Sequence, residues 1–360
     1  MSAFNVDSNI ARASTIDKSV YTSPEFFISA KEKIFAKTWQ YAGHNEQLQK
    51  TGDCMPVALL PGYLDEPLIV TNANNSLHCM SNVCTHRGKI LAEHACNVNQ
   101  LRCRYHGRVF DMKGKFKSMP EFKEVENFPS EADNLTRVSF FEWSKFLFAS
   151  INPIKPAEVF FNDMMQRVAW MPLHEFMHAP QHDKDYLINC NWALYCENYL
   201  EGFHVPFVHA CLNAVLDFSD YNTELFFPYS NLQLGVSKTS ENCFDLPATS
   251  PDYGRNIAAY YFWVFPNMMF NFYPWGLSIN IIQPLSVDKT KVRFITFIWR
   301  EELRNTGAGG DLDKVEKEDE EIVESVQKGV QSRFYNKGRY SVTREQGTHH
   351  FHRLLAEFLG

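Results

Sequence analysis

The sequence predicts an α+β protein with two domains, on three observations. First, 360 residues are enough for about two domains at a typical size of roughly 100–200 residues each. Second, residues 41–150 contain short β-rich pieces, such as 67–71 and 145–151, separated by Gly, Asn, Pro and Asp turns. This pattern is typical of a small antiparallel β-domain. Third, strands precede helices in blocks beyond residue 152, which favours an α+β domain.

The individual elements follow from periodicity and turn residues. Residues 24–39 carry apolar positions at helical spacing and predict an N-terminal amphipathic helix. Pro153 and Pro156 mark a boundary between domains. The elements predicted beyond it are a helix around 190–210, strands near 258–284 and 291–300, and helices near 312–332 and 344–358. The predicted domains are therefore a helical segment at 1–40 that packs on the last domain, a β-domain at 41–152, and an α+β domain at 153–360.

Composition and charge exclude several classes of function. The formal net charge is −7 and the pI is near 6.0; no run of Lys and Arg forms the positive footprint that nucleic acid requires. The most apolar stretch, 257–270, is too short to span a membrane, and no secretory signal is visible at the N-terminus. We therefore expect a cytoplasmic protein that binds neither membrane nor nucleic acid. Its nine cysteines are then expected to be thiols or metal ligands.

The strongest motif pairs one Cys and one His in each of two loops. Cys84 and His86 form the first half, and Cys103 and His106 form the second. Two Cys and two His can bind a tetrahedral zinc ion or a Rieske [2Fe–2S] cluster, in which two histidines ligate one iron. Zinc motifs usually pair Cys with Cys and His with His. The mixed halves favour the cluster, with zinc as the alternative.

A second candidate metal site contains His204 and His209. An iron that activates dioxygen is usually bound by two His and one carboxylate, with positions left open for oxygen. Five residues apart on a straight helix, the two rings would point about 140° away from one another. Pro206 lies between them and is expected to kink or break the helix, so that the rings converge. Without a third ligand the pair could equally be structural.

The carboxylate is predicted from the helix near 312–330. Its apolar positions project onto one stripe at about 100° per residue; they are Leu312, Val315, Ile322, Val323, Val326 and Val330. Asp319 falls near the centre of that stripe. Glu318 falls at its edge, and Glu316, Glu320, Glu321 and Glu324 fall outside it. A buried acid is costly unless it is paired or bound to metal, so Asp319 is predicted to be the third ligand. The alternative is an ion pair with a buried Arg.

These segments resemble one enzyme family. CTHRGK at 84–89 and CRYHGRVFD at 103–111 resemble the Rieske domain of ring-hydroxylating and related oxygenases. ENYLEGFH at 197–204, the following His209, and EDEEIVESVQKG at 318–329 resemble the iron-site segments of the same family. Arg108 stands where Trp is common, and we expect this difference to alter the surface that docks a partner.

The resemblance implies a fold, cofactors and residue roles. It implies a Rieske domain beside a helix-grip (START-like) catalytic domain with a central antiparallel sheet, usually in a homotrimer. Cys84, His86, Cys103 and His106 would bind the [2Fe–2S] cluster, and His204, His209 and Asp319 a mononuclear Fe(II). Glu201 resembles the carboxylate that links the iron histidines to a Rieske histidine of the neighbouring subunit. A Glu there resembles the branch that includes carnitine oxygenase and choline monooxygenase.

The implied activity is oxygenation by O2, either mono- or dioxygenation, with electrons from a separate flavin and iron–sulfur reductase. The expected substrate is a small quaternary or methylated amine, hydroxylated or N-demethylated, because aromatic faces attract a desolvated ammonium and residues 260–276 are rich in aromatics. Tyr261, Trp263, Tyr273 and Trp275 would share a face of that strand region, although such residues can equally be core. The alternatives are an oxygenase of aromatic rings or aromatic acids, a pure electron carrier, and a zinc-stabilised binding protein.

Overall fold

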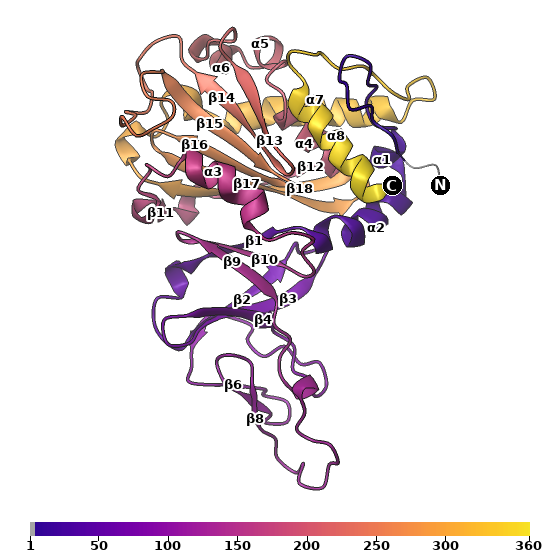
Figure 1. The fold of residues 1–360 in the computed structure, drawn as a ribbon, viewed down its shortest axis with the longest axis vertical. Coiled ribbons are helices and arrows are strands. Elements are labelled where there is room, and N and C mark those ends of the chain that lie inside the picture. The colour runs from indigo at the N-terminus through magenta and orange to yellow at the C-terminus, as the bar shows by residue number, and fades with distance from the viewer. Residues whose placement is uncertain (1–3) are drawn as a thin grey trace. The chain divides into compact units, whose positions relative to one another are not determined.

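The computed structural model describes residues 4–360, which fall into two compact units (Figure 1). The larger unit joins the N-terminal residues, up to Phe35, to residues 155–360, and the smaller unit is residues 36–154. The regular elements of the smaller unit are strands and single-turn helices, and the larger unit contains one large antiparallel sheet with helices. The structure thus confirms the α+β fold class.

The smaller unit consists of three antiparallel sheets. Their strands are β1 (Gln40–His44), β2 (Asp53–Leu59), β3 (Glu66–Asn72), β4 (Leu77–Ser81), β5 (Cys96–Asn97), β6 (Leu101–Arg102), β7 (Val109–Phe110), β8 (Phe116–Ser118), β9 (Ser139–Trp143) and β10 (Phe146–Ser150). The strand orders are β1-β10-β9, β4-β3-β2-β5 and β6-β7-β8. Cys84 and Cys103 belong to the apolar core between these sheets, together with Ile69, Met80 and Phe110. The core therefore fixes both Cys-containing loops.

The sheet of the larger unit has eight strands in the order β11-β18-β17-β16-β15-β14-β13, and β12 also pairs with β18. The strands are β11 (Met177–His178), β12 (Lys184–Ile188), β13 (Asn222–Phe226), β14 (Ser230–Val236), β15 (Ile257–Val264), β16 (Met268–Tyr273), β17 (Gly276–Ser286) and β18 (Lys289–Ile298). All residues of β14, β15 and β16 are buried, so both faces of the central sheet are covered.

The helices of the larger unit are α1 (Ser19–Thr22), α2 (Pro24–Lys33), α3 (Glu158–Arg167), α4 (Trp192–Tyr199), α5 (Val205–Val208), α6 (Ala210–Val215), α7 (Leu312–Val330) and α8 (Gln346–Leu359). No helix among the described residues is long and apolar enough to cross a membrane. The helix predicted at 24–39 ends at Lys33, because a single 3₁₀ turn and then β1 follow it.

Alternation along the strands divides the central sheet into an apolar face and a mixed face. On one face Phe262 and Phe270 are paired across β15 and β16, and Phe270 contacts Phe161 of α3. On the other face Trp263 packs against Phe351 of α8, with ring centroids 5.4 Å apart. Because successive side chains of a strand point to opposite faces, Tyr261 lies on the α8 face as well.

A buried histidine connects three parts of the larger unit. His352 of α8 is fully buried, and its ring contacts the hydroxyls of Tyr21 and Tyr340 at 3.2 and 2.5 Å. Its Nε2 also lies 2.9 Å from a carboxylate oxygen of Glu197 in α4. His352 therefore forms a buried polar junction that joins α8 to the N-terminal segment and to α4. Figure 1 shows α2 in indigo beside α8 in yellow.

The close approach of α8 to α4 depends on a glycine and yields a first prediction. A Cβ on Gly347 would lie 2.3 Å from the backbone oxygen of Leu200, so Gly347→Ala must displace α8. We expect a loss of about 1–3 kcal/mol in unfolding free energy, measured as a lower Tm. The control is Gly329→Ala in α7, where a Cβ meets nothing within 4 Å and the better helix propensity of Ala should hold or raise Tm. Equal Tm values for the two variants would contradict this packing argument.

Candidate metal centres and substrate cavity

The two Cys-containing loops of the smaller unit have the same backbone geometry. In the first loop the N–H of Cys84 donates to the oxygen of Lys89 (2.9 Å), and the N–H of Gly88 donates to the oxygen of Cys84 (3.0 Å). In the second, Cys103 donates to Arg108 (2.8 Å) and Gly107 to Cys103 (3.0 Å). Gly88 and Gly107 have φ values of +71° and +77°, which glycine adopts without strain.

The side chains of these loops fit a [2Fe–2S] cluster. The thiols of Cys84 and Cys103 are both buried, and burial raises the pKa of the Cys84 thiol, so a metal charge is needed to hold it as a thiolate. The rings of His86 and His106 lie 4.7 Å apart between centroids. The Nδ1 atom of His106 is buried and has no hydrogen-bond partner among the described residues. An unpaired buried nitrogen beside two buried thiols is the donor set that metal ligation would satisfy.

Arg108 does not reach the surface, contrary to the expectation that it alters a docking surface. Its side chain is only 2% exposed, and its guanidinium lies over the rings of Phe116 and Phe128, 5.0 and 5.4 Å from their centroids. It also pairs with Asp133. An Arg can be buried in this way because the acid offsets its charge and the aromatic faces attract the planar cation.

The second candidate site is assembled by a break in the helix predicted at 190–210. Helix α4 ends at Tyr199, and the chain resumes helical structure only at Val205. His204 precedes the single turn of α5, and His209 follows it. Pro206 occupies the first turn of α5, where a missing N–H costs little. The break therefore lies before the proline rather than at it, but the two rings do converge, with centroids 5.1 Å apart.

Asp319 of α7 completes a group of three metal-ligand side chains. The Nε2 atoms of His209 and His204 lie 3.1 and 3.6 Å from its Oδ1, and one ligand atom from each residue lies within 4.8 Å of the others. Ligand atoms held at about 2.0–2.2 Å from one metal ion are roughly 3 Å apart, so the spacing fits. Asn198 donates a 2.6 Å hydrogen bond to Asp319. The ion-pair partners of Asp319 in the described chain are these two histidines, not the buried Arg considered as an alternative.

Two further carboxylates fix the orientation of the imidazoles. Glu201 lies 2.7 Å from Nδ1 of His204, and Glu318 lies 2.8 Å from Nδ1 of His209. Burial alone would lower the pKa of His209, but its hydrogen bonds to Asp319 and Glu318 outweigh burial and raise it. A carboxylate on the far nitrogen fixes the tautomer that presents Nε2 and makes the imidazole a stronger ligand. The role of Glu318 was missed because its position lies at the edge of the apolar stripe.

The apolar stripe predicted for α7 is only partly its buried face. Val323 and Val330 are buried, but Ile322 and Val326 are 37% and 42% exposed. Glu316 and Gln327 are buried instead. Gln327 accepts a 2.8 Å hydrogen bond from the N–H of Asn191, and Glu316 accepts one of 2.6 Å from the hydroxyl of Tyr195. Partners on α4 thus let polar residues face inward, which an apolar count does not detect.

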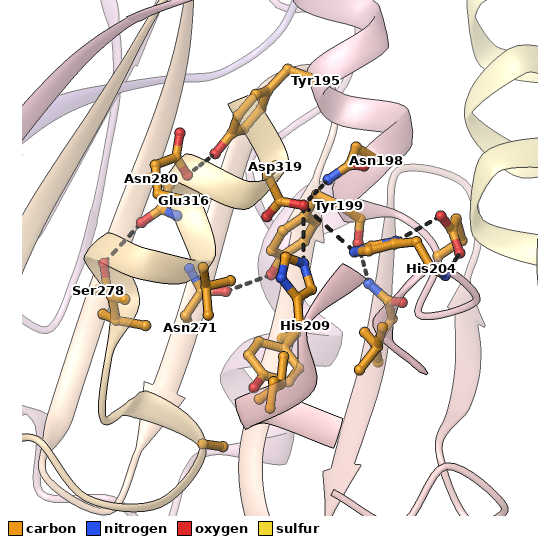
Figure 2. A pocket seen from close by; sticks show the side chains of 18 of the residues that line it. Tyr195, Asn198, Tyr199, His204, His209, Asn271, Ser278, Asn280, Glu316 and Asp319 are labelled. Carbon is orange, nitrogen blue, oxygen red and sulfur yellow. Dashed lines mark hydrogen bonds and ion pairs between the residues drawn. The ribbon is translucent and has the colours of Figure 1, made fainter. Parts of the chain in front are cut away.

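A cavity of about 100 Å³ lies beside the three metal-ligand side chains. It is smaller than the roughly 300–1,000 Å³ typical of pockets for drug-sized ligands. One row of paired residues forms part of its sheet wall, namely Gln233, Tyr261, Asn271 and Ser278 on β14 to β17. The other strand residues that line it are Tyr273, Asn280 and Phe294. Helices supply the opposite wall, including Tyr195, Tyr199, Glu316 and Asp319 (Figure 2). Burial raises the pKa of Glu316 to about 8, although the hydrogen bond from Tyr195 acts to lower it.

The four aromatics selected from the sequence occupy different places. Tyr261 and Tyr273 line the cavity. Trp263 shares a face with Tyr261 but is covered by α8. Trp275 lies in the turn after β16 and stacks on Tyr273 at 5.2 Å, so its ring backs the cavity wall without lining it. The tyrosines at 195, 199 and 221, which also line the cavity, were not selected because they lie outside the aromatic-rich stretch.

Comparisons with known proteins agree with both centres. Residues 38–129 match the model of the Rieske [2Fe–2S] domain, and residues 173–360 match that of the ring hydroxylating alpha subunit (catalytic domain). The chain belongs to the Rieske oxygenase alpha-subunit family. It is an oxygenase subunit with a [2Fe–2S] domain and a His–His–Asp candidate site for mononuclear iron. This assignment excludes the electron carrier and the zinc-stabilised binding protein.

Individual relatives span nearly the whole chain. Choline monooxygenase, chloroplastic, of Arabidopsis thaliana is 30% identical and covers 96% of this chain and 83% of its own. The carnitine monooxygenase oxygenase subunit of Escherichia coli K12 is 28% identical and covers 98% of this chain and 96% of its own. The crystal structure of the quaternary ammonium Rieske monooxygenase CntA with an inhibitor superposes with a TM-score of 0.79 at 23% identity, covering 99% of this chain and all of that one. The last comparison supports the fold.

The geometry predicts that Asp319→Ala removes one metal and spares the other. Without the carboxylate the two imidazoles keep no anionic ligand between them, whereas the cluster loops lie in the other unit. We expect iron to fall from about three to about two per chain, with the cluster absorbance and electron-spin signal retained. Glu321→Ala, which removes an exposed acid of the same helix, should keep full iron. Full iron in Asp319→Ala would remove Asp319 from the ligand set.

Proposed function

We propose that this chain oxygenates a small, positively charged amine, inserting one oxygen atom of O2 into a C–H bond. The other oxygen atom is reduced to water, with two electrons from a separate reductase and two protons. Hydroxylation next to the nitrogen of a methylated amine would lead to loss of that carbon. The observation that supports this proposal is the charge of the cavity beside the His–His–Asp group.

The cavity wall suits a cation. Its ionisable side chains are Glu201, Glu316 and Asp319 with the two histidines and five tyrosines, and no Lys or Arg is present among the lining residues that the structure describes. Tyrosine faces attract an ammonium by about 0.5–2 kcal/mol each. An aromatic acid would bring a further negative group beside these carboxylates, with no Lys or Arg among the described lining residues to pair with it. The names of the curated relatives, which refer to choline and carnitine, support the same substrate class.

The residue roles follow from the donors described above. We assign Cys84, His86, Cys103 and His106 as ligands of the [2Fe–2S] cluster, and His204, His209 and Asp319 as ligands of the mononuclear iron. Iron bound there would supply the binding and reduction of dioxygen. The protein itself positions the substrate in the adjacent cavity, and holding reactants together accounts for much of the rate of such a reaction.

We also propose two kinds of partner. Electrons come from a separate reductase, which fits the name of the carnitine monooxygenase oxygenase subunit as one component of a larger system. A homotrimer would place Glu201 between His204 and a Rieske histidine of a neighbouring subunit. One oxygen of Glu201 contacts His204, and the other accepts the backbone N–H groups of Phe203 and His204, so its carboxylate is held firmly in place.

A matched substrate panel tests the cationic substrate. Purified enzyme with a surrogate reductase is offered quaternary ammonium compounds, their neutral 3,3-dimethylbutyl isosteres, and aromatic acids. We expect oxygen uptake coupled to product only with the ammonium compounds, and a preference over the isosteres of about tenfold or more, since the isosteres lose the attraction to several aromatic faces. Turnover of aromatic acids would instead favour an oxygenase of aromatic acids. Turnover of the isosteres at the same rate as the ammonium compounds would indicate a site that does not recognise the positive charge.

Glu201→Gln separates metal binding from electron delivery. The amide keeps the shape but loses the charge that orients His204. We expect both metals to stay bound, while kcat falls by roughly 10- to 100-fold. Metal analysis and single-turnover oxidation of the pre-reduced cluster are measured beside steady-state rates. Glu302→Gln, in an exposed loop, is the matched control. Normal steady-state turnover in Glu201→Gln would exclude Glu201 from the mechanism.

A further inference from the structure

One buried carboxylate in the cavity belongs neither to the three metal-ligand side chains nor to the acids that orient them. Glu316 lies one helical turn before Asp319 in α7, is 3% exposed, and lines the cavity. Its Oε2 accepts the hydroxyl of Tyr195 at 2.6 Å, and its Oε1 is buried without a hydrogen-bond partner among the described residues. Figure 2 shows Glu316 beside Asn280 and Tyr195, on the side of Asp319 away from His204.

An unpaired oxygen on a buried acid is costly, which indicates that something else fills the position. Leaving such an acceptor unsatisfied costs about 1–3 kcal/mol, and more for a charged group. No Lys or Arg is present among the described residues that line this cavity. The missing donor and the missing positive charge are therefore best supplied by the bound molecule.

The chemistry of the donor is restricted further. A quaternary ammonium has no N–H and cannot donate a hydrogen bond, so it satisfies aromatic faces but not Oε1. A hydroxyl on the same molecule can donate to Oε1. Side chains three positions apart on a helix have Cβ atoms about 5–6 Å apart. A molecule that reaches from Glu316 to the metal-ligand group beside Asp319 is therefore only a few bonds long, which agrees with the small cavity.

We propose that Glu316 accepts a hydrogen bond from a hydroxyl of the substrate, so that the site selects small ammonium alcohols over ammonium carboxylates. This inference rests on the proposed cationic substrate and adds which cations are accepted. A cation in the cavity favours the ionised form of Glu316, so an ammonium carboxylate would place its anionic end against a like charge, with no Lys or Arg among the described lining residues to pair with it. Glu316 is then a specificity-determining residue that touches the substrate but takes no part in the oxidation.

Three compounds that share a trimethylammonium head, two cations and one zwitterion, test the selection with the unaltered enzyme. They are (2-hydroxyethyl)trimethylammonium, ethyltrimethylammonium, which lacks the hydroxyl, and a trimethylammonium carboxylate of similar length. We expect kcat/KM for the alcohol to exceed that for the ethyl compound by about 10- to 100-fold, the value of a hydrogen bond to a charged group. The carboxylate should be the poorest of the three. Calorimetric binding of the same three compounds to iron-free protein should follow the same order.

Variants identify the residue responsible. In Glu316→Leu the alcohol and the ethyl compound should become equal in KM and binding, and Glu316→Gln, which retains an accepting oxygen, should keep part of the preference. Glu321→Gln removes an exposed acid of the same helix and should leave all three values unchanged. If Glu316→Leu does not fold, Glu316→Gln tests the residue by itself, and an undiminished preference for the alcohol in that variant overturns the role of Glu316.

The outcomes separate the two levels of the proposal. Equal kcat/KM for all three ammonium compounds in the unaltered enzyme, or a preference for the carboxylate, overturns the role of Glu316, while a substrate with an ammonium head still stands. If the preference for the alcohol persists in Glu316→Leu, the enzyme does select alcohols, but Glu316 is not the residue responsible. Failure of every cation, with turnover of neutral or aromatic compounds, overturns the proposed function itself.

Discussion

The arrangement of the larger unit depends on two imidazoles being held with their Nε2 atoms toward one carboxylate. His204 and His209 achieve this because a different acid, Glu201 or Glu318, binds the far nitrogen of each ring. Three carboxylates, Glu201, Glu318 and Asp319, therefore surround the two imidazoles, and like charges in a partly buried site repel. A dipositive ion bound there would offset that repulsion and would link folding to metal binding.

The break between α4 and α5 serves the same constraint. A continuous helix would separate the rings, whereas the chain from Leu200 to His204 leaves helical geometry and brings both ring nitrogens to α7. Asn198, at the end of α4, binds Asp319 directly, and Glu197 beside it pairs with the buried His352. Helix α4 is thus fixed at the metal site and at the junction with α8. The irregular segment from Leu200 to His204 is therefore held in place through helix α4, which precedes it.

Much of the fold and of the metal chemistry could be predicted from the sequence because both rely on strong local signals. Paired Cys and His with following glycines indicate a cluster loop directly, and Asp319 was found from helical periodicity. The buried face of α7 was predicted less well, since Glu316 and Gln327 turn inward only because Tyr195 and the N–H of Asn191 lie opposite. These hydrogen bonds join residues more than 100 positions apart, so the spacing of residues along α7 does not reveal them. Alternation along the strand predicts that Trp263 shares a face with Tyr261, but it does not predict which part of that face α8 covers. Helix α8 packs over Trp263 and separates it from the cavity.

Four residues of the sheet wall, Gln233, Tyr261, Asn271 and Ser278, come from four different strands and are paired with one another across the sheet. Backbone hydrogen bonds of the ladder do not depend on these side chains, so each position can change chemically while the sheet keeps its geometry. Related chains can therefore acquire new substrate preferences by exchanging a few side chains along this line. The scaffold would then diversify without losing the candidate iron site beside the cavity.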